Sequence, residues 1–213
     1  SAGLIHNLAT WNVKGLEYED FEDAYFSTVG YHKQRWGSGF DSSAFVDDFP
    51  ISFFEDLIAD SSNNYNNIID NTSFSNDMKD FIGRLVTDLK DTASLPANFA
   101  YDDIKDIVLD WESDAIASHA FSEAELSTLS HIGSVGRFST LFWHDMFSDE
   151  WSKMSSQEQQ AAGKKRKWWQ WLIVGVCDVV GAVAGATVNP GVAVATGASA
   201  SVGAATIINW GAE

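Results

Sequence analysis

Two low-charge stretches of small and apolar residues, 168–188 and 191–208, make up most of the C-terminal part of this 213-residue chain. The Asn189-Pro190 dipeptide between them is a turn signal, and proline is tolerated in the first turn of a helix. At 1.5 Å per residue, the two stretches predict a helical hairpin with arms of about 30 and 27 Å. One alternative stays open, because Val192, Val194 and Thr196 alternate as they would in a β-strand.

The hairpin is rich in glycine and carries one charged residue in its first arm. Small residues on one helix face let two backbones approach closely, so recurring glycines predict tight packing of the arms. Asp178 lies in the middle of the first arm. If the hairpin packs inside the protein, this carboxylate needs a buried partner such as a Trp N–H, a His or an Arg. The glycines expected to pack are Gly181, Gly185, Gly191, Gly197 and Gly203.

A membrane role for the same hairpin is the competing hypothesis. The first arm has eight Leu, Ile or Val residues, each contributing roughly −0.3 to −0.6 kcal/mol to insertion, and Asp178 costs about 2.5–3.5 kcal/mol. These terms nearly cancel, so neither arm is a committed transmembrane helix, although protonation of Asp178 would lower the cost. A basic run followed by tryptophans resembles an interfacial anchor, and the same run can instead bind an acidic protein surface. These candidate surface residues are Lys164, Lys165, Arg166, Lys167, Trp168, Trp169 and Trp171.

The charge of the chain is divided unevenly. The net charge is −17, from 30 Asp and Glu against 13 Lys and Arg. Two of the acids and four of the bases lie in residues 161–213, so the net charge is −19 before this boundary and +2 after it. We therefore expect an acidic helical bundle over 1–160 and a basic, Trp-led hairpin segment over 161–213, packed into the same domain. The acidity argues against nucleic acid as a partner.

Helical periodicity dominates residues 1–160. Apolar residues from 74 to 89 form one stripe of an α-helix, which Ser73 or Ser75 can cap, and residues 101–117 repeat the pattern. Ser122 and Glu125 form a capping box, which predicts a helix running to about Phe147. Shorter helices are expected around 21–29 and 54–58, the latter either broken or continued by the Asn-rich residues 61–67. The predicted fold is all-α: a bundle of about five helices plus a C-terminal Gly/Ala-rich helical hairpin.

No motif in the chain identifies a reaction, and we expect no cofactor. The single Cys177 excludes a disulfide framework and lies in an apolar run, where a thiol is inert. The histidines show no metal-ligand spacing, and no phosphate-binding glycine loop occurs. Two alternatives stay open: a weak calcium site within residues 60–80, and a hydrolase that uses scattered carboxylates. The histidines are His6, His32, His119, His131 and His144; the acidic groups are Glu17, Glu19, Asp20, Glu22 and Asp23, Asp47-Asp48, and Asp102-Asp103.

Two loose resemblances bear on function. The order of features resembles that in uncharacterised exported helical proteins of bacteria. Those proteins begin with a Gly-x-x-His-Asn element, which is followed by a helix with the pattern Leu-Ser…Ser-x-x-Phe-Trp. A basic, Trp-rich stretch then precedes a Gly/Ala segment. The matching residues are Gly3, His6 and Asn7, then Leu129, Ser130, Ser139, Phe142 and Trp143, then 164–171. Residues 168–208 are similar in composition to the apolar hairpin that pore-forming bacteriocins shelter inside a water-soluble helical domain.

These observations lead to one principal functional hypothesis and two alternatives. We expect a non-enzymatic bacterial protein, secreted or attached to the cell envelope after removal of a leader, whose hairpin serves packing or binds a protein partner. A cytoplasmic location is the alternative to export. The second hypothesis is a bacteriocin-like protein that inserts residues 168–208 into an anionic membrane, and the third is the carboxylate hydrolase.

Overall fold

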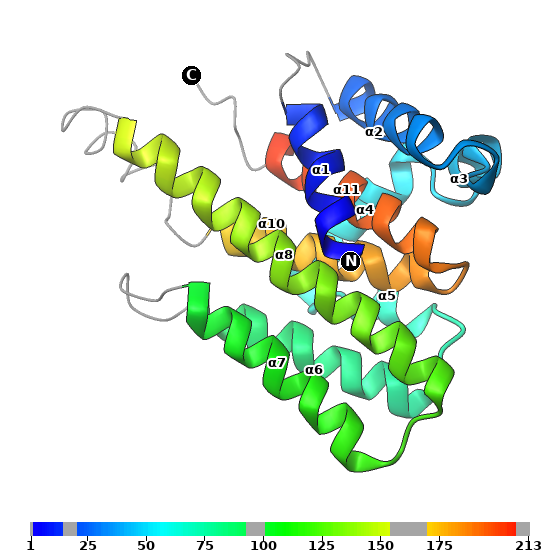
Figure 1. Ribbon diagram of the computed structural model, residues 1–213, viewed down its shortest axis with the longest axis vertical. Helices are drawn as coiled ribbons and strands as arrows, with labels where there is room; N and C mark the ends of the chain where they lie inside the picture. The colour runs from blue at the N-terminus through cyan, green and yellow to red at the C-terminus, as the bar shows by residue number, and fades with distance from the viewer. Residues whose placement is uncertain (1, 15–20, 93–100, 154–169, 208–213) are drawn as a thin grey trace.

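The computed structural model describes residues 2–14, 21–92, 101–153 and 170–207, and these residues form an all-helical structure without strands (Figure 1). The strand alternative for residues 192–196 is wrong, since they lie inside a helix. The described elements are α1 (Ala2–Lys14), α2 (Phe21–Trp36), the 3-10 turn η1 (Gly37–Gly39), α3 (Ser42–Asp48), α4 (Ile51–Ala59), the 3-10 turn η2 (Asp60–Asn63), α5 (Asn66–Asp70), α6 (Asn76–Thr92), α7 (Tyr101–Ser118), α8 (Glu123–Lys153), α10 (Gln170–Ala186) and α11 (Pro190–Ile207).

Helix α6 follows the apolar stripe of its sequence. Its buried side chains are the residues that recur at spacings of three and four, so one face of the helix enters the core. Of the two serines that can cap it, Ser75 does so, because its hydroxyl accepts a hydrogen bond from the Met78 backbone N–H at 3.3 Å. The Asn-rich residues after α4 break that helix into η2 and α5, with Asn64 and Tyr65 in the left-handed region.

The capping box at the start of α8 forms as its sequence predicts. The Ser122 hydroxyl accepts from the Glu125 backbone N–H at 3.3 Å, and Glu125 Oε2 accepts from the Ser122 backbone N–H at 2.9 Å. These hydrogen bonds lower the pKa of Glu125, which keeps the carboxylate charged at the positive end of the helix. The helix continues past Phe147 to Lys153, since residues 148–153 contain no glycine or proline to stop it.

Removal of this cap gives a first test of the fold. Ser122→Ala is expected to lower the free energy of unfolding by about 1 kcal/mol, because it leaves the Glu125 N–H without its acceptor. Urea denaturation of the two proteins measures the difference. Ser130→Ala, an exposed change within α8, is the matched control and should leave stability within about 0.5 kcal/mol of the original.

Three described α-helices before residue 153 are additional to the five expected: α1, α3 and α5. Helix α1 is not evident from the sequence, because its large apolar side chains face solvent and its small or polar ones face the core. Its buried side is small or polar, whereas Leu4, Leu8 and Trp11 are 51%, 45% and 65% exposed. Short α3 depends on its cap, in which Asp41 accepts from two backbone N–H groups at 3.0 and 3.1 Å. Neither helix has the apolar stripe by which a helix is found in a sequence.

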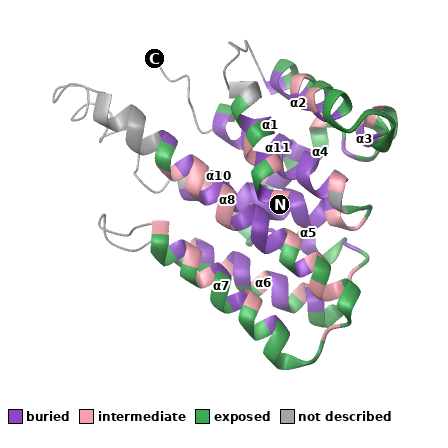
Figure 2. Cartoon of the chain, viewed as in Figure 1, coloured by how far each residue is buried: buried purple, intermediate pink, exposed green. Residues whose placement is uncertain are grey.

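Helices α10 and α11 lie at the centre of the molecule and pack along each other (Figure 2). Residues 187–189 join them, and the Asn189 side chain caps α11 by accepting from the Val192 N–H at 3.0 Å. Helix α10 packs against α4, α5, α6 and α8, while α11 packs against α1, α2, α4 and α8. A single core cluster therefore contains side chains from both sides of residue 160.

Candidate functional site

A buried carboxylate joins three helices at the centre of the molecule. Asp178 on α10 is fully buried, and its Oδ2 accepts hydrogen bonds from the Trp143 indole N–H at 2.9 Å and from the Ser139 hydroxyl, both on α8. Its Oδ1 lies 3.2 Å from Nε2 of His6 on α1, an ion-pair distance, although the N–H does not point along the hydrogen-bond direction. We call these four residues the Asp178 cluster.

Asn7 determines the protonation of His6. Its Nδ2 donates to the Phe138 carbonyl at 2.7 Å, so its Oδ1 faces Nδ1 of His6 at 3.0 Å. Because an amide oxygen only accepts, Nδ1 of His6 must carry a proton. Nε2 lies 3.2 Å from the Asp178 carboxylate, which favours a second proton on this nitrogen. The surroundings of His6 thus favour its charged form and a buried ion pair with Asp178.

The electrostatics of His6 agree with this assignment. Burial disfavours the charged ring, but the Asp178 charge and the interactions with Asp178, Asn7 and the Gly197 backbone outweigh it. The pKa of His6 is consequently raised above its ordinary value of 6.5.

The Asp178 cluster contains the residue types of a hydrolytic triad in an arrangement that does not suit catalysis. In such a triad the histidine lies between the serine and the carboxylate and takes the proton of the serine. Here Ser139 and His6 both contact Asp178, which places the carboxylate between them. Ser139 is also fully buried, so no substrate reaches its hydroxyl. This arrangement fixes three helices and does not activate a nucleophile.

Gly181 and Gly185 lie where α10 and α11 approach most closely. A Cβ atom at Gly181 would be 2.7 Å from the Thr196 carbonyl oxygen and 2.8 Å from the Ala200 Cβ. At Gly185 a Cβ would collide with the Thr196 side chain and lie 2.8 Å from the Ala193 Cα. Both positions therefore require glycine for their packing.

The other three glycines singled out from the sequence have different surroundings. Gly197 faces both α10 and α1: a Cβ there would be 3.0 Å from the Asp178 backbone carbonyl oxygen and 3.4 Å from the His6 ring. Gly203 faces α2, where a Cβ would be 2.7 Å from the ring of Phe21. Gly191 is in the first turn of α11 and is close only to the side chain that caps this helix. Three of the five glycines, Gly181, Gly185 and Gly197, thus lie between the arms, while Gly203 brings α2 close to α11.

The candidate surface residues lie almost wholly outside the part of the chain that the structure describes. Lys164, Lys165, Arg166, Lys167, Trp168 and Trp169 belong to residues 154–169. Trp171 is in α10, but its side chain is likewise outside the described part. The membrane or partner role of this segment stays a prediction.

The acidic pairs are distributed over separate helices. Asp47 and Asp48 are exposed at the end of α3, and Asp102 and Asp103 are exposed in the first turn of α7. Glu22 and Asp23 are exposed on α2, and residues 17–20 lie outside the described part. Within the described residues, no group of three or more His, Cys, Asp or Glu side chains is suited to holding a metal.

The remaining candidate side chains are engaged in the fold. Asp60, in the segment considered for calcium, accepts from the Asn67 amide at 2.7 Å and from the Ile68 N–H at 3.2 Å. Cys177 lies 3.3 Å from the Tyr65 hydroxyl, and burial raises the pKa of its thiol to about 12. Cys177 is thus a neutral core residue.

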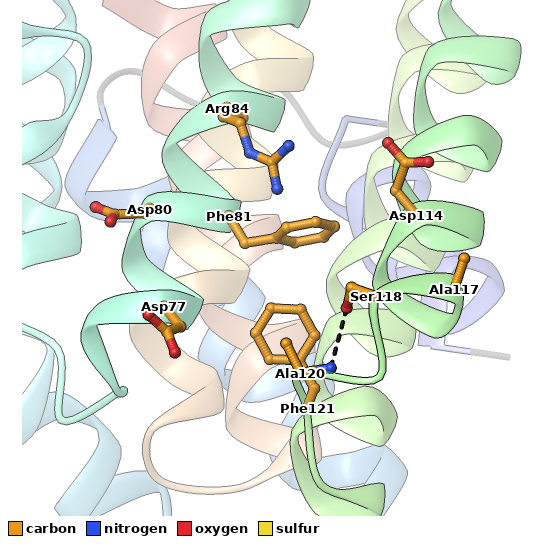
Figure 3. A pocket seen from close by; sticks show the side chains of 9 residues that line it. All are labelled: Asp77, Asp80, Phe81, Arg84, Asp114, Ala117, Ser118, Ala120 and Phe121. Carbon is orange, nitrogen blue, oxygen red and sulfur yellow. Dashed lines mark hydrogen bonds between the residues drawn. The ribbon is translucent and has the colours of Figure 1, made fainter.

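A groove of about 530 Å³ lies on the surface between α6 and α7 (Figure 3). Asp77 and Asp80 line it from α6 and Asp114 from α7, while the Arg84 guanidinium lies 4.5 Å above the ring of Phe81. No histidine or cysteine lines this groove. It therefore presents carboxylates and one cation to solvent.

The partners of Asp178 could not be identified from the sequence, although two are of the expected kinds, a Trp N–H and a His. The residues behind the resemblance to exported bacterial proteins provide the missing signal. Of these, His6, Ser139 and Trp143 belong to the Asp178 cluster, and Asn7 orients His6. Gly3 lets α1 approach α8, because a Cβ atom there would collide with the Ser134 carbonyl oxygen and lie 2.6 Å from the Phe138 Cβ. Five of the matching residues thus meet where α1, α8 and α10 come together.

Comparisons with protein-family models, with curated proteins and with solved structures give no match to this chain.

Proposed function

We propose that this chain is a non-enzymatic, exported bacterial protein in which the Gly/Ala hairpin is the packing core for a bundle of about five principal helices, and that it acts by binding a protein partner. The enclosure of α10 and α11 carries the proposal. Residues 174–185 and 192–205 are buried within a single chain. The ion pair of the Asp178 cluster supports it further, because it fixes α1 and α8 to the hairpin.

The chemistry of the described polar groups supports a binding role over catalysis. The Asp178 cluster is sealed from solvent, so its serine and histidine cannot reach a substrate. The net charge of −17 favours a protein partner over nucleic acid. Export is supported by the resemblance to exported bacterial proteins.

A membrane-active function is the second candidate, favoured by the sheltered position of the low-charge hairpin. None of the described helices combines the length and the apolar character needed to cross a membrane. In this second function, α10 and α11 leave the core at a bilayer. In the first function, they stay buried.

Hydrogen exchange of the full chain with and without anionic vesicles separates the two functions. If the hairpin is a packing core, amides of α10 are expected to keep their protection between about pH 4 and 7 in the presence of phosphatidylglycerol vesicles, and an enclosed dye should not leak. Vesicles of phosphatidylcholine are the control for non-specific adsorption. The urea-unfolded chain, diluted onto the same vesicles, shows that a released hairpin would be detected.

Leakage from anionic vesicles together with loss of α10 protection would overturn the packing proposal and support the membrane-active function. Unchanged protection without leakage supports the packing proposal.

A further inference from the structure

His32 is a fully buried histidine outside the Asp178 cluster. Its Nδ1 accepts a hydrogen bond from the Trp36 indole N–H at 3.3 Å. Because an indole N–H only donates, this Nδ1 carries no proton, and the ring is neutral with its proton on Nε2. That Nε2 is buried and has no hydrogen-bond partner. The core therefore holds one charged histidine, His6, and one neutral histidine, His32.

The surroundings of His32 disfavour a second proton on its ring. It would occupy Nδ1, where it would face the Trp36 N–H donor, and it would charge a ring whose Nε2–H also lacks an acceptor. Burial and the nearby positive charge of His6 lower the pKa of His32 to about 3. The protonated ring is therefore stable only where water can reach it.

Among the described side chains, the elements packed against α2 offer His32 no compensating charge. Helix α11 and the turn η1 contain no Asp, Glu, His, Lys or Arg. On α3 the acids Asp47 and Asp48 are exposed, and so are Glu55 and Asp56 on α4, whose Phe54 packs against Phe21 and Tyr25 of α2. The titratable described side chain of α1 is His6, whose charge repels a proton on His32. On α2 itself the charged side chains are exposed: Glu22, Asp23, Lys33 and Arg35.

We propose that His32 is a pH-sensitive switch: its protonation releases α2 from α11 and exposes the apolar face of the hairpin. Helix α2 lies at the edge of the molecule, while α6 and α7 lie on the other side of α10 (Figure 1). It covers α11 through Phe21, which contacts Gly203, and through Ala24, which packs with Val202. Release of α2 would therefore expose one side of α11 and leave α6 and α7 folded. This property goes beyond the proposed function.

The direction of the pH effect follows from the two states of His32. An exposed ring has the ordinary pKa of 6.5 and the docked ring a pKa of about 3, so the open state binds one more proton between these values. Opening thus becomes more favourable as the pH falls through 6.5, by about tenfold per unit. The raised pKa of His6 opposes only those openings that break the Asp178 cluster, to which α2 contributes no residue. From pH 7.5 to 5 the opening equilibrium of α2 should rise about 30-fold.

Hydrogen exchange of the full chain at several pH values tests the proposed release of α2, with exchange rates corrected for the intrinsic effect of pH. We expect amides of α2 to lose about 30-fold in protection between pH 7.5 and 5, while amides of α6 keep theirs. In His32→Gln, which cannot be protonated, the loss in α2 should disappear. His131→Gln removes a partly exposed histidine of α8 and should behave as the original protein.

Two results would overturn the proposal: an equal loss of α2 protection in the original protein and in His32→Gln, or a loss shared by α2 and α6, which indicates global unfolding. If His32→Gln does not fold, His32→Phe keeps an apolar ring against Phe40 and cannot be protonated either, and the same comparison applies. Binding of a hydrophobic dye provides a second measurement. It should increase at pH 5 in the original protein and stay low in either variant.

Discussion

Asp178→Ala is expected to lower the free energy of unfolding by about 3–5 kcal/mol, the cost of removing one partner from a buried ion pair. The change takes away the acceptor of the Trp143 N–H and the Ser139 hydroxyl, and it leaves the His6 ring without its counter-charge. None of these groups can turn to water, because all are buried. Denaturation in urea at pH 6 measures the loss.

An exposed ion pair provides the matched control. Asp102 lies 3.7 Å from Lys105 and its side chain is 80% exposed, so Asp102→Ala should cost less than about 1 kcal/mol. If Asp178→Ala lowers the free energy of unfolding as little as Asp102→Ala does, the pair of Asp178 and His6 does not hold the helices together. Asp178→Asn should cost less than Asp178→Ala, because its amide oxygen still accepts from α8.

The pH dependence of stability identifies the ion pair itself. Because the pKa of His6 is raised in the folded state, its stabilising effect is fully present below pH 6.5 and is lost as the pH rises through the raised value. This alkaline loss should be absent from Asp178→Asn, which has no charge to pair with the ring. A loss of the same size in both proteins would assign it to other groups.

The sequence predicts helices well where an apolar stripe or a cap marks them. The stripe of α6 and the capping box of α8 locate these helices because burial of one face and satisfaction of the first N–H groups are local requirements. Helix α1 has neither signal. It is held by Gly3, His6 and Asn7, whose partners lie on distant helices, and its apolar residues face outward. Only the folded arrangement explains why these residues form a helix.

The Asp178 cluster could likewise be predicted only in part from the sequence. An Asp in an apolar helix implies a buried partner, since a lone buried charge is too costly. Which tryptophan and which histidine meet it depends on how α1 and α8 cross α10, and this geometry is set by side-chain packing over the whole core. The neutral state of His32 is also invisible in the sequence, because it depends on the direction of the Trp36 N–H.

Gly181→Ala is expected to destabilise the protein by about 1–3 kcal/mol, although alanine is the better helix former. The new methyl group would lie 2.7 Å from the Thr196 carbonyl oxygen and 2.8 Å from the Ala200 Cβ. The carbonyl belongs to the backbone of α11, so no side-chain rotation relieves the contact and the two helices must separate. Because α11 also contacts α1 and α2, that separation disturbs the whole core.

Gly83→Ala on α6 is the matched control, since a Cβ there meets nothing within 4 Å. It should stabilise the protein by about 0.5–1 kcal/mol, the gain in helix propensity, so the two glycine substitutions should shift the urea midpoint in opposite directions. In the double variant Gly181→Ala/Ala200→Gly, only part of the loss should be recovered, because the contact with the Thr196 carbonyl remains. A stabilising effect of Gly181→Ala would mean that α10 and α11 pack less closely than the structure requires.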